Sequence, residues 1–340
     1  MSALLVGESS VSRMRPILTL VVGLALFAST TSCNRGGTNT AGKSGEGGNV
    51  APKTFDSPAA AGAALFEAAK AGDQNALVEI FGSEGKDFVY SGDSVKDKNA
   101  MQTFVDKYSR MNRWDARKSG DEILYIGADN FAFPIPLSKN SSGKWAFNTA
   151  AGKDEVLARR IGDGELTTIG VLTEVANAQQ EYFSQNHQFA QKFISDGGQR
   201  NGLYWPVSAG QHSSPLGGLV DVAKALGYSQ SDKPQPFNGY YYKILTRQGD
   251  AAKGGAKDYI AGGKMTGGFA VIAWPAKYRD SGIMTFLVGK DGMVYQKDLG
   301  EKTTETAAAI TDYNPGDGWT VILAPESPSK ATRDMRTAQE

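Results

Sequence analysis

Residues 154–186, DEVLARRIGDGELTTIGVLTEVANAQQEYFSQN, decide the fold of the second half of the chain. Residues 154–161 predict a short helix, which the triplet Gly162-Asp163-Gly164 is expected to break. From Glu165 onward, side chains that can be buried recur at helical spacing and predict one long amphipathic helix. The expected buried stripe consists of Leu166, Ile169, Leu172, Val175, Ala176, Gln179 and Tyr182.

Strand-like runs follow this helix and predict an antiparallel meander. After a loop containing Tyr204-Trp205-Pro206 and a helix over residues 215–226, the runs lie at residues 240–246, 268–274, 284–288, 293–297 and 318–324. Gly289-Lys290-Asp291-Gly292 ends in the Asp-Gly pair that hairpin turns favour, and residues 318–324 are expected to form an edge strand or extended tail. A long helix followed by a meander predicts an α+β domain over residues 153–325, with residues 326–340 as a disordered tail.

Residues 55–152 predict a further α+β domain, in which helices precede a curved sheet. Helices are expected at residues 58–71, 76–81 and 99–111, and strands at residues 122–126, 131–137 and 144–149. This order resembles the nuclear transport factor 2-like and cystatin-like folds, in which the sheet cups a pocket. Three candidate acids lie in a stretch rich in Gly, Ser and Lys that indicates a solvated loop: Asp87, Asp93 and Asp97. Trp114 and Trp145 could line the pocket or fill the core.

The first 32 residues predict a secretory signal peptide. Arg13 and Arg15 precede an apolar run at 17–29, and small residues precede the only cysteine, Cys33. The run is shorter than the roughly 20 residues that a spanning helix needs. The small residues before Cys33 resemble the lipobox of bacterial lipoproteins, although Thr30 stands where that motif usually carries leucine. The alternative is a soluble exported protein with an unpaired thiol, and Met14 is an alternative start.

By this resemblance, Cys33 carries the lipid, and Asn34 in place of an aspartate implies the outer membrane, facing the periplasm. Residues 33–54 are then the lipid anchor and a flexible, glycine-rich tether. Gly37-Thr-Asn-Thr-Ala-Gly42-Lys43-Ser44 matches the P-loop pattern, but no strand is expected before it and no helix after it. We therefore expect no nucleotide.

Composition and motifs argue against several other classes of function. The chain holds 36 basic and 36 acidic residues, which gives no net attraction to nucleic acid. The chain has two histidines, His187 and His212, and lacks the Gly-x-Ser-x-Gly motif. The sequence therefore predicts no serine–histidine–acid catalytic set. Asp312, Asn314 and Asp317 fail the EF-hand pattern, so neither a metal nor another cofactor is expected. Residues 262–268 are as rich in glycine as phosphate loops, but they precede a strand and predict a turn.

Aromatic residues of the second domain are the remaining candidate for a functional surface. Tyr240 and Tyr242 share one face of an alternating strand, while Tyr241 takes the other. One face is expected to be core, and the other could contact a ligand or a partner protein. The candidate binding surface consists of Tyr204, Trp205, Tyr240, Tyr242, Trp274 and Tyr278.

Two family resemblances complete the expectations. The sequences AQQEYF at 178–183, GYYYKIL at 239–245 and AWPA at 273–276 resemble the globular part of pilins and pseudopilins. Residues 54–319 resemble an uncharacterised bacterial family, domain of unknown function 2950, through motifs such as FPIP at 133–136, RRIG at 159–162, LYWP at 203–206 and YQKDLG at 295–300.

These observations predict a lipid-anchored periplasmic protein that is a non-enzymatic binding module with an envelope protein as its partner. The alternative is a small-ligand carrier or an enzyme that uses a pocket in the first domain. Asp87, Asp93 or Asp97 would then act as acid or base, beside Trp114 or Trp145.

Overall fold

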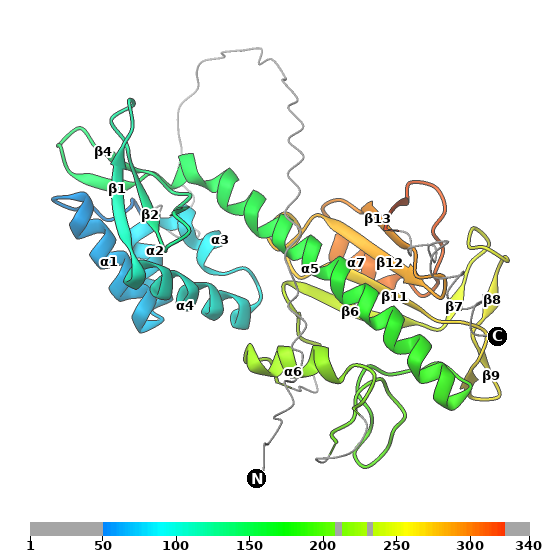
Figure 1. Ribbon diagram of the computed structural model, residues 1–340. Coiled ribbons are helices and arrows are strands. Elements are labelled where there is room, and N and C mark those ends of the chain that lie inside the picture. Colours follow the sequence, from blue (N-terminus) through cyan, green and yellow to red (C-terminus); the bar gives the residue numbers. More distant parts are fainter. Residues whose placement is uncertain (1–49, 208–212, 230–233, 324–340) are drawn as a thin grey trace, which may run out of the picture. The chain divides into compact units, whose positions relative to one another are not determined.

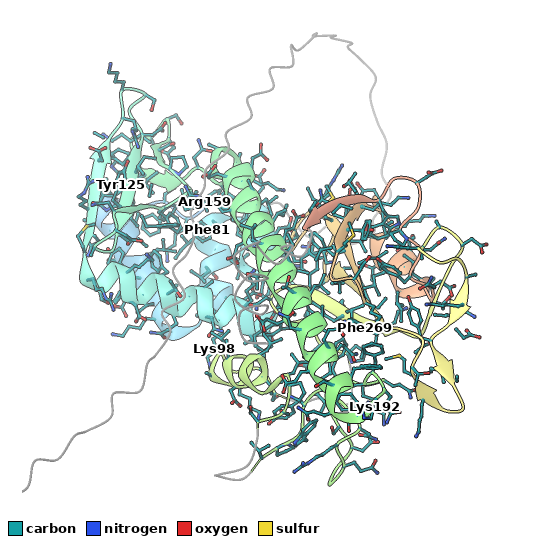
Figure 2. All side chains as sticks on the ribbon, turned by 45° about the vertical axis from the view of Figure 1, so that its right-hand side comes forward. Phe81, Lys98, Tyr125, Arg159, Lys192 and Phe269 are labelled. Carbon is teal, nitrogen blue, oxygen red and sulfur yellow. The ribbon has the colours of Figure 1, made fainter. Side chains whose placement is uncertain are left out.

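The computed structural model describes residues 50–207, 213–229 and 234–323 (Figure 1). Helices combine with antiparallel sheets, which confirms the α+β class. Buried apolar side chains gather in two groups, here called the N-terminal cluster and the C-terminal cluster. Phe81 belongs to the first and Phe269 to the second (Figure 2).

The N-terminal cluster lies between helices and a five-stranded antiparallel sheet. The helices are α1 (Pro58–Ala71), α2 (Gln74–Phe81), η1 (Ser83–Gly85), α3 (Lys86–Val89) and α4 (Ser94–Arg110). The strands are β1 (Asn112–Ala116), β2 (Glu122–Ile126), β3 (Phe131–Ala132), β4 (Leu137–Lys139) and β5 (Trp145–Phe147). Their order is β1-β2-β4-β5, and β3 pairs with β2.

Local signals explain where these elements begin and end. The Ser57 hydroxyl accepts a hydrogen bond from the Ala60 amide at the start of α1, and Gly72 ends the helix with φ 65°. Helix α4 begins earlier than predicted because Asp93 caps it, accepting from the amides of Val95 and Lys96. The strand predicted over residues 131–137 is interrupted, since Pro134 and Pro136 cannot donate to a ladder.

Helix α5 (Thr149–Asn186) runs without interruption through the segment where a break was predicted (Figure 1). A Cβ atom on Gly164 would lie 2.6 Å from the Ser281 carbonyl oxygen, so this glycine allows a close approach of two backbones. A Cβ on Gly162 would meet nothing within 4 Å. The predicted break is therefore wrong. Each glycine is about 1 kcal/mol less favourable than alanine in a helix, and the tertiary packing of α5 outweighs this cost. The predicted boundary between residues 152 and 153 falls inside α5.

The C-terminal cluster lies around a second antiparallel sheet of order β14-β13-β12-β11-β6. These strands are β6 (Tyr240–Leu245), β11 (Ala270–Pro275), β12 (Met284–Gly289), β13 (Val294–Asp298) and β14 (Thr320–Leu323). Helix α5 packs on β11, β12 and β13, and α7 (Thr303–Ala309) packs on β11. Helix α6 (Gly217–Ala225) precedes the sheet, and two small ladders pair β7 (Arg247–Gln248) with β8 (Lys257–Asp258) and β9 (Ile260–Ala261) with β10 (Lys264–Met265).

The hairpin prediction is confirmed, as is the edge position of the last strand. The Gly292 amide donates to the Gly289 carbonyl at 3.0 Å, and Gly292 has φ 71°, which a side chain would disfavour. Strands β12 and β13 pair through five registered positions on either side of this turn. Strand β14 stands at the edge of the sheet order.

Helix α5 supplies side chains to both clusters. Val156 packs against the N-terminal cluster, whereas Leu172 and Val175 are buried in the C-terminal one. One member of the predicted stripe is wrong, since Leu166 is 73% exposed. Its neighbour Glu165 faces the sheet instead and accepts hydrogen bonds from the amides of Ile283 and Met284, each 3.0 Å long.

Several sequence predictions concern residues 1–49 and 326–340, outside the described residues. They include the signal peptide, Cys33, most of the tether, the P-loop pattern and the tail. Within residues 50–207, 213–229 and 234–323, no helix combines the length and apolar character needed to cross a bilayer.

Candidate functional site

A cavity of about 450 Å³ opens in the N-terminal cluster. Its volume lies within the roughly 300–1,000 Å³ that small-molecule sites occupy. Apolar side chains from α1, α2, α3, α4, α5 and the β3–β4 region form its walls: Leu65, Ala69, Leu77, Phe81, Phe88, Val89, Met101, Phe104, Phe133, Ile135 and Val156. The cavity therefore suits an apolar ligand.

Charged residues of the cavity lining are tied to partners. Lys96 lies 2.9 Å from Asp163, and the Arg159 Nε lies 2.6 Å from Glu155. The Arg159 guanidinium also covers the Phe131 ring, with 5.0 Å between its central carbon and the ring centroid. These pairings leave little positive charge to hold an anionic ligand.

Asp97 brings a buried carboxyl group to this cavity. Its side chain belongs to α4, and the residue is 9% exposed. Both carboxyl oxygens accept from the Ser91 amide, at 3.1 and 3.3 Å. Burial raises the pKa of Asp97, while the hydrogen bonds from Ser91 and the charge of Arg160 oppose that rise. A carboxylate has about four lone-pair positions, so Asp97 retains acceptor capacity toward the cavity.

The other two candidate acids have structural positions outside the cavity lining. Asp93 is buried and accepts from the Tyr228 hydroxyl at 2.7 Å and from the Gly239 amide at 2.9 Å. Asp87 is half-buried and accepts from the Lys277 ammonium at 2.9 Å, which lowers the pKa of Asp87. The predicted solvated loop is thus wrong for Asp93 and Asp97, because distant parts of the chain and helix α4 cover them.

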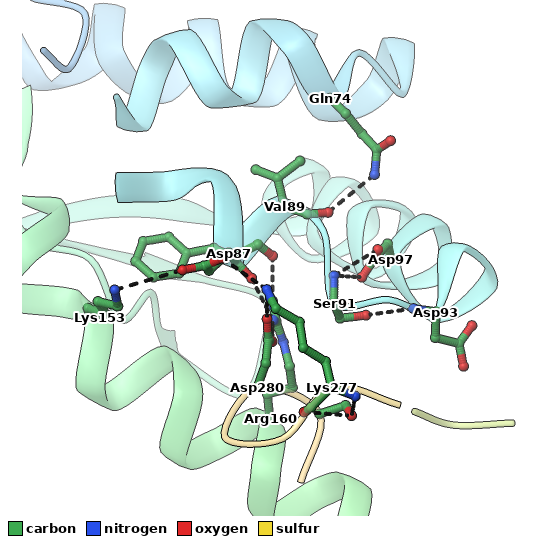
Figure 3. Close-up of polar contacts among 12 residues, drawn as sticks. Gln74, Asp87, Val89, Ser91, Asp93, Asp97, Lys153, Arg160, Lys277 and Asp280 are labelled. Carbon is green, nitrogen blue, oxygen red and sulfur yellow. Dashed lines mark hydrogen bonds and ion pairs between the residues drawn. The ribbon is translucent and has the colours of Figure 1, made fainter. Parts of the chain in front are cut away.

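Arg160 connects helix α5 to α3 and to Asp280 through polar contacts (Figure 3). It donates from α5 to the carbonyl oxygens of Asp87 and Phe88 in α3, the first at 2.7 Å. It also binds the Asp280 carboxylate, whose second oxygen lies 2.7 Å from Lys277 in an ion pair without hydrogen-bond geometry. Phe88, which Arg160 fixes through its carbonyl, lines the cavity.

Neither candidate tryptophan lines the cavity. Trp145 is buried in the N-terminal cluster, and Lys139 lies over its ring, 4.9 Å from the centroid. Trp114 is partly buried against the same cluster. Both indoles serve the core, which is the alternative that the sequence left open.

The six aromatic residues proposed as a binding surface do not form an open surface. Four of them are buried in the C-terminal cluster, namely Tyr204, Trp205, Tyr240 and Trp274. Tyr242 is half-buried and its hydroxyl lies 3.3 Å from Thr168 Oγ1, while the half-buried Tyr278 donates to Asp298 at 3.0 Å. The two-faced pattern leaves no open face because β6, which carries Tyr240 and Tyr242, has no exposed residue and pairs with β11, which is buried along its whole length.

Sequence reasoning missed Arg160 and Lys96 as site residues. Arg160 stood in the quoted motif RRIG, but nothing in its neighbourhood indicated that the partner would be Asp280, 120 positions away. Among the described residues, no group of three or more His, Cys, Asp or Glu side chains could hold a metal ion. The cavity lining offers apolar contact and, at Asp97 and Ser91, groups that can hydrogen-bond.

Comparisons with known proteins identify a family but no activity. No curated protein and no solved structure matches the chain, so the resemblances to pilins and to nuclear transport factor 2-like folds stay predictions. A family model described as "Protein of unknown function (DUF2950)" matches residues 52–322, which is most of the chain and confirms the resemblance seen in the sequence. The chain therefore belongs to the DUF2950 family.

Proposed function

We propose that this protein binds an uncharged, apolar small molecule in the N-terminal cavity and carries it without altering it. The observation that carries the proposal is the position of Asp97, a buried carboxyl group in the lining of a cavity with mostly apolar walls, whose other charged side chains are paired with one another or with neighbours. An apolar ligand with one hydroxyl group would fill the cavity and donate a hydrogen bond to this side chain.

The other charged side chains of the lining favour binding over catalysis. A general acid or base must be positioned to exchange a proton with the substrate, and a group held in an ion pair is less available for that role. Lys96 and Asp163 are paired with each other, and Arg159 and Arg160 are paired with carboxylates. The hypothesis that a partner binds the aromatic residues of the second half of the chain is less favoured, because most of these residues are buried.

Decan-1-ol is a suitable probe because it joins a flexible apolar chain to one hydroxyl group. We expect it to bind at least tenfold more tightly than decanoate, whose charge would face the Asp97 carboxyl without a free cation, a difference of about 1.4 kcal/mol. Isothermal titration calorimetry on the full chain measures both affinities. Asp97→Asn should reduce the preference for the alcohol, because the side chain becomes neutral.

Blocking the cavity provides a matched control. Ala100 is exposed on α4 and lines the cavity, so the Ala100→Trp indole should block it and abolish decan-1-ol binding. Ala158 is equally exposed on α5 and does not line the cavity, so Ala158→Trp should bind normally. Equal affinity of both variants for decan-1-ol, or tighter binding of decanoate than of the alcohol by the unaltered chain, would refute the proposal.

The proposed carrier is anchored in the cell envelope through Cys33 and faces the periplasm. Support comes from the sequence alone: the basic start, the short apolar run, the small residues before Cys33 and the glycine-rich tether. Two or more acyl chains on one residue would give stable anchoring, whereas a single chain binds a membrane only marginally. A tethered carrier would keep an apolar ligand out of water close to the membrane.

Replacing Cys33 with serine tests the anchor. The variant should move from the membrane fraction to the soluble periplasm, because the hydroxyl cannot take the thioether-linked lipid. Fractionation followed by immunoblotting measures the shift, and Ser32→Ala, which keeps a small residue before the cysteine, is the control that should stay on the membrane. A Cys33→Ser protein that remains fully on the membrane would contradict the anchor and leave the cavity proposal untouched.

A further inference from the structure

A second cavity, of about 530 Å³, lies on the C-terminal cluster and is independent of the proposed carrier site. It is built from the β7–β8 segment, the residues just before β11, the β12–β13 hairpin and the stretch around Tyr313. Its walls are more polar than those of the first cavity: Gln248, Lys253, Lys257, Tyr259, Lys290, Asp291, Tyr295 and Tyr313.

Three lysines give this cavity an excess of positive charge. Within the part of the chain that the structure describes, Lys253, Lys257 and Lys290 have no carboxylate within ion-pair distance. Lys257 lies over the Tyr259 ring, and Lys290 lies over aromatic rings of the core. Asp291 is the opposing charge in the lining, and one of its oxygens accepts from the Met293 amide at 3.1 Å.

Tyr313 supplies a buried hydroxyl group without a hydrogen bond of normal geometry among the described residues, while Asp291 and Tyr295 lie close enough to add to the rise that burial causes in its pKa. The residue is 6% exposed, and among the described residues its hydroxyl oxygen makes no hydrogen bond. Its backbone is held from both sides, since its amide donates to the Arg247 carbonyl and its carbonyl accepts from the Gly249 amide, both at 3.0 Å. A buried hydroxyl without a partner is costly, and a ligand that accepts a hydrogen bond from it would remove that cost.

The walls of the cavity are fixed by buried hydrogen bonds. The Gln248 amide nitrogen donates to the carbonyls of Lys253 and Gly255, at 3.0 and 2.7 Å. Its amide oxygen accepts from the Tyr259 hydroxyl at 2.9 Å. Gly268 has φ 155°, and a Cβ atom there would lie 2.9 Å from the Tyr259 ring. Gly268, near the end of the glycine-rich run at residues 262–268, thus leaves room for the Tyr259 ring to pack against the backbone of the cavity wall.

We propose that this cavity binds a small phosphate-bearing molecule. A phosphate group carries up to two negative charges and several acceptor oxygens, which suits a lining that includes three exposed lysines and one tyrosine hydroxyl group. The cavity volume of about 530 Å³ is many times the roughly 30 Å³ that one water molecule takes in the liquid. The cavity therefore has room for more than a phosphate group. The remaining space beside the rings of Tyr259, Tyr295 and Tyr313 would hold the rest of a sugar phosphate or a lipid headgroup.

Pyrophosphate is the probe for the lysines. We expect Lys253→Gln/Lys257→Gln/Lys290→Gln to weaken its binding to the full chain by about tenfold or more in calorimetry. Lys98, Lys118 and Lys302 are exposed, lie outside the cavity lining and have no ion pair among the described residues. Their triple Gln variant removes the same net charge and should change the affinity less than about twofold. Equal losses in both variants would overturn the proposal.

Tyr313→Phe tests the hydroxyl group separately. The variant should weaken pyrophosphate binding several-fold while its thermal stability stays equal or rises, because it removes a buried group that has no partner. Unchanged affinity would overturn the role given to Tyr313. Phosphatidylcholine vesicles with and without phosphatidic acid distinguish the source of the phosphate. Binding that requires phosphatidic acid assigns a lipid headgroup, binding of pyrophosphate alone assigns a soluble phosphate, and binding of neither refutes the site.

Discussion

Arg160→Met is expected to lower the free energy of unfolding by about 3–5 kcal/mol, because it leaves a buried carboxylate without its main partner. The side chains of Arg160 and Asp280 are only 13% and 5% exposed. The substitution would also leave the carbonyls of Asp87 and Phe88 without their donor. Lys277 would remain beside Asp280, but its side chain is 46% exposed and cannot replace the guanidinium. Urea denaturation followed by tryptophan fluorescence measures the change.

Arg159→Met is the matched control, one position away on the same helix. Arg159 pairs with Glu155 and donates to the Ala132 carbonyl, and both contacts are exposed, where such interactions contribute little. We expect a loss of no more than about 1 kcal/mol. If the two variants were equally stable, the network around Arg160 would not hold the cavity wall as described. Weakened decan-1-ol binding in Arg160→Met, measured where the variant is still folded, would tie the network to the cavity.

Asp93→Ala is expected to destabilise the protein by about 3 kcal/mol, since four hydrogen-bond donors lose their acceptor. Two of them are the first amides of α4, and the others are the Tyr228 hydroxyl and the Gly239 amide. Burial and the neighbouring Asp93 raise the pKa of Tyr228, so its hydroxyl stays protonated and needs an acceptor. Chemical denaturation gives the free energy of unfolding.

Asp73→Ala separates the capping contribution from the rest. Asp73 caps α2 by accepting from the Ala76 amide, but it is exposed, and its side chain has no distant partner within the part of the chain that the structure describes. Its loss should cost about 1 kcal/mol, the usual value for a cap. An Asp93→Ala variant that loses no more than Asp73→Ala would show that the contacts to Tyr228 and Gly239 do not contribute to stability.

Elements with local signals could be predicted from the sequence, whereas those that depend on distant contacts could not. Ser57 and Gly72 mark the ends of α1 in the sequence, and the Asp-Gly pair marks the hairpin turn. By contrast, Gly164 was expected to break a helix, because the carbonyl of Ser281 that it accommodates comes from a remote segment. Short-range patterns report backbone preference, and they carry no information about which chain segment will approach.

The candidate site shows the same division. Asp97 was among the three acids named from the sequence, but its burial depends on the fold of the elements around it. Tyr240 and Tyr242 were expected to share one face of a strand whose other face could be open, but no residue of β6 is exposed in the sheet, and a period of two does not show whether the second face is covered. A pocket in the first domain was expected from the fold resemblance, but its lining could not be named, and the second cavity was not expected, since each is lined by residues from several separate segments.

The continuity of α5 also restricts how the length of this chain can vary. Its 38 residues extend for about 57 Å at 1.5 Å per residue. One inserted residue between Arg160 and Val171 would rotate everything beyond it by about 100°. Leu172 and Val175 would then turn away from the sheet while Arg160 kept its partners. Insertions and deletions should therefore be excluded from this segment and tolerated in exposed turns such as the one at Gly143.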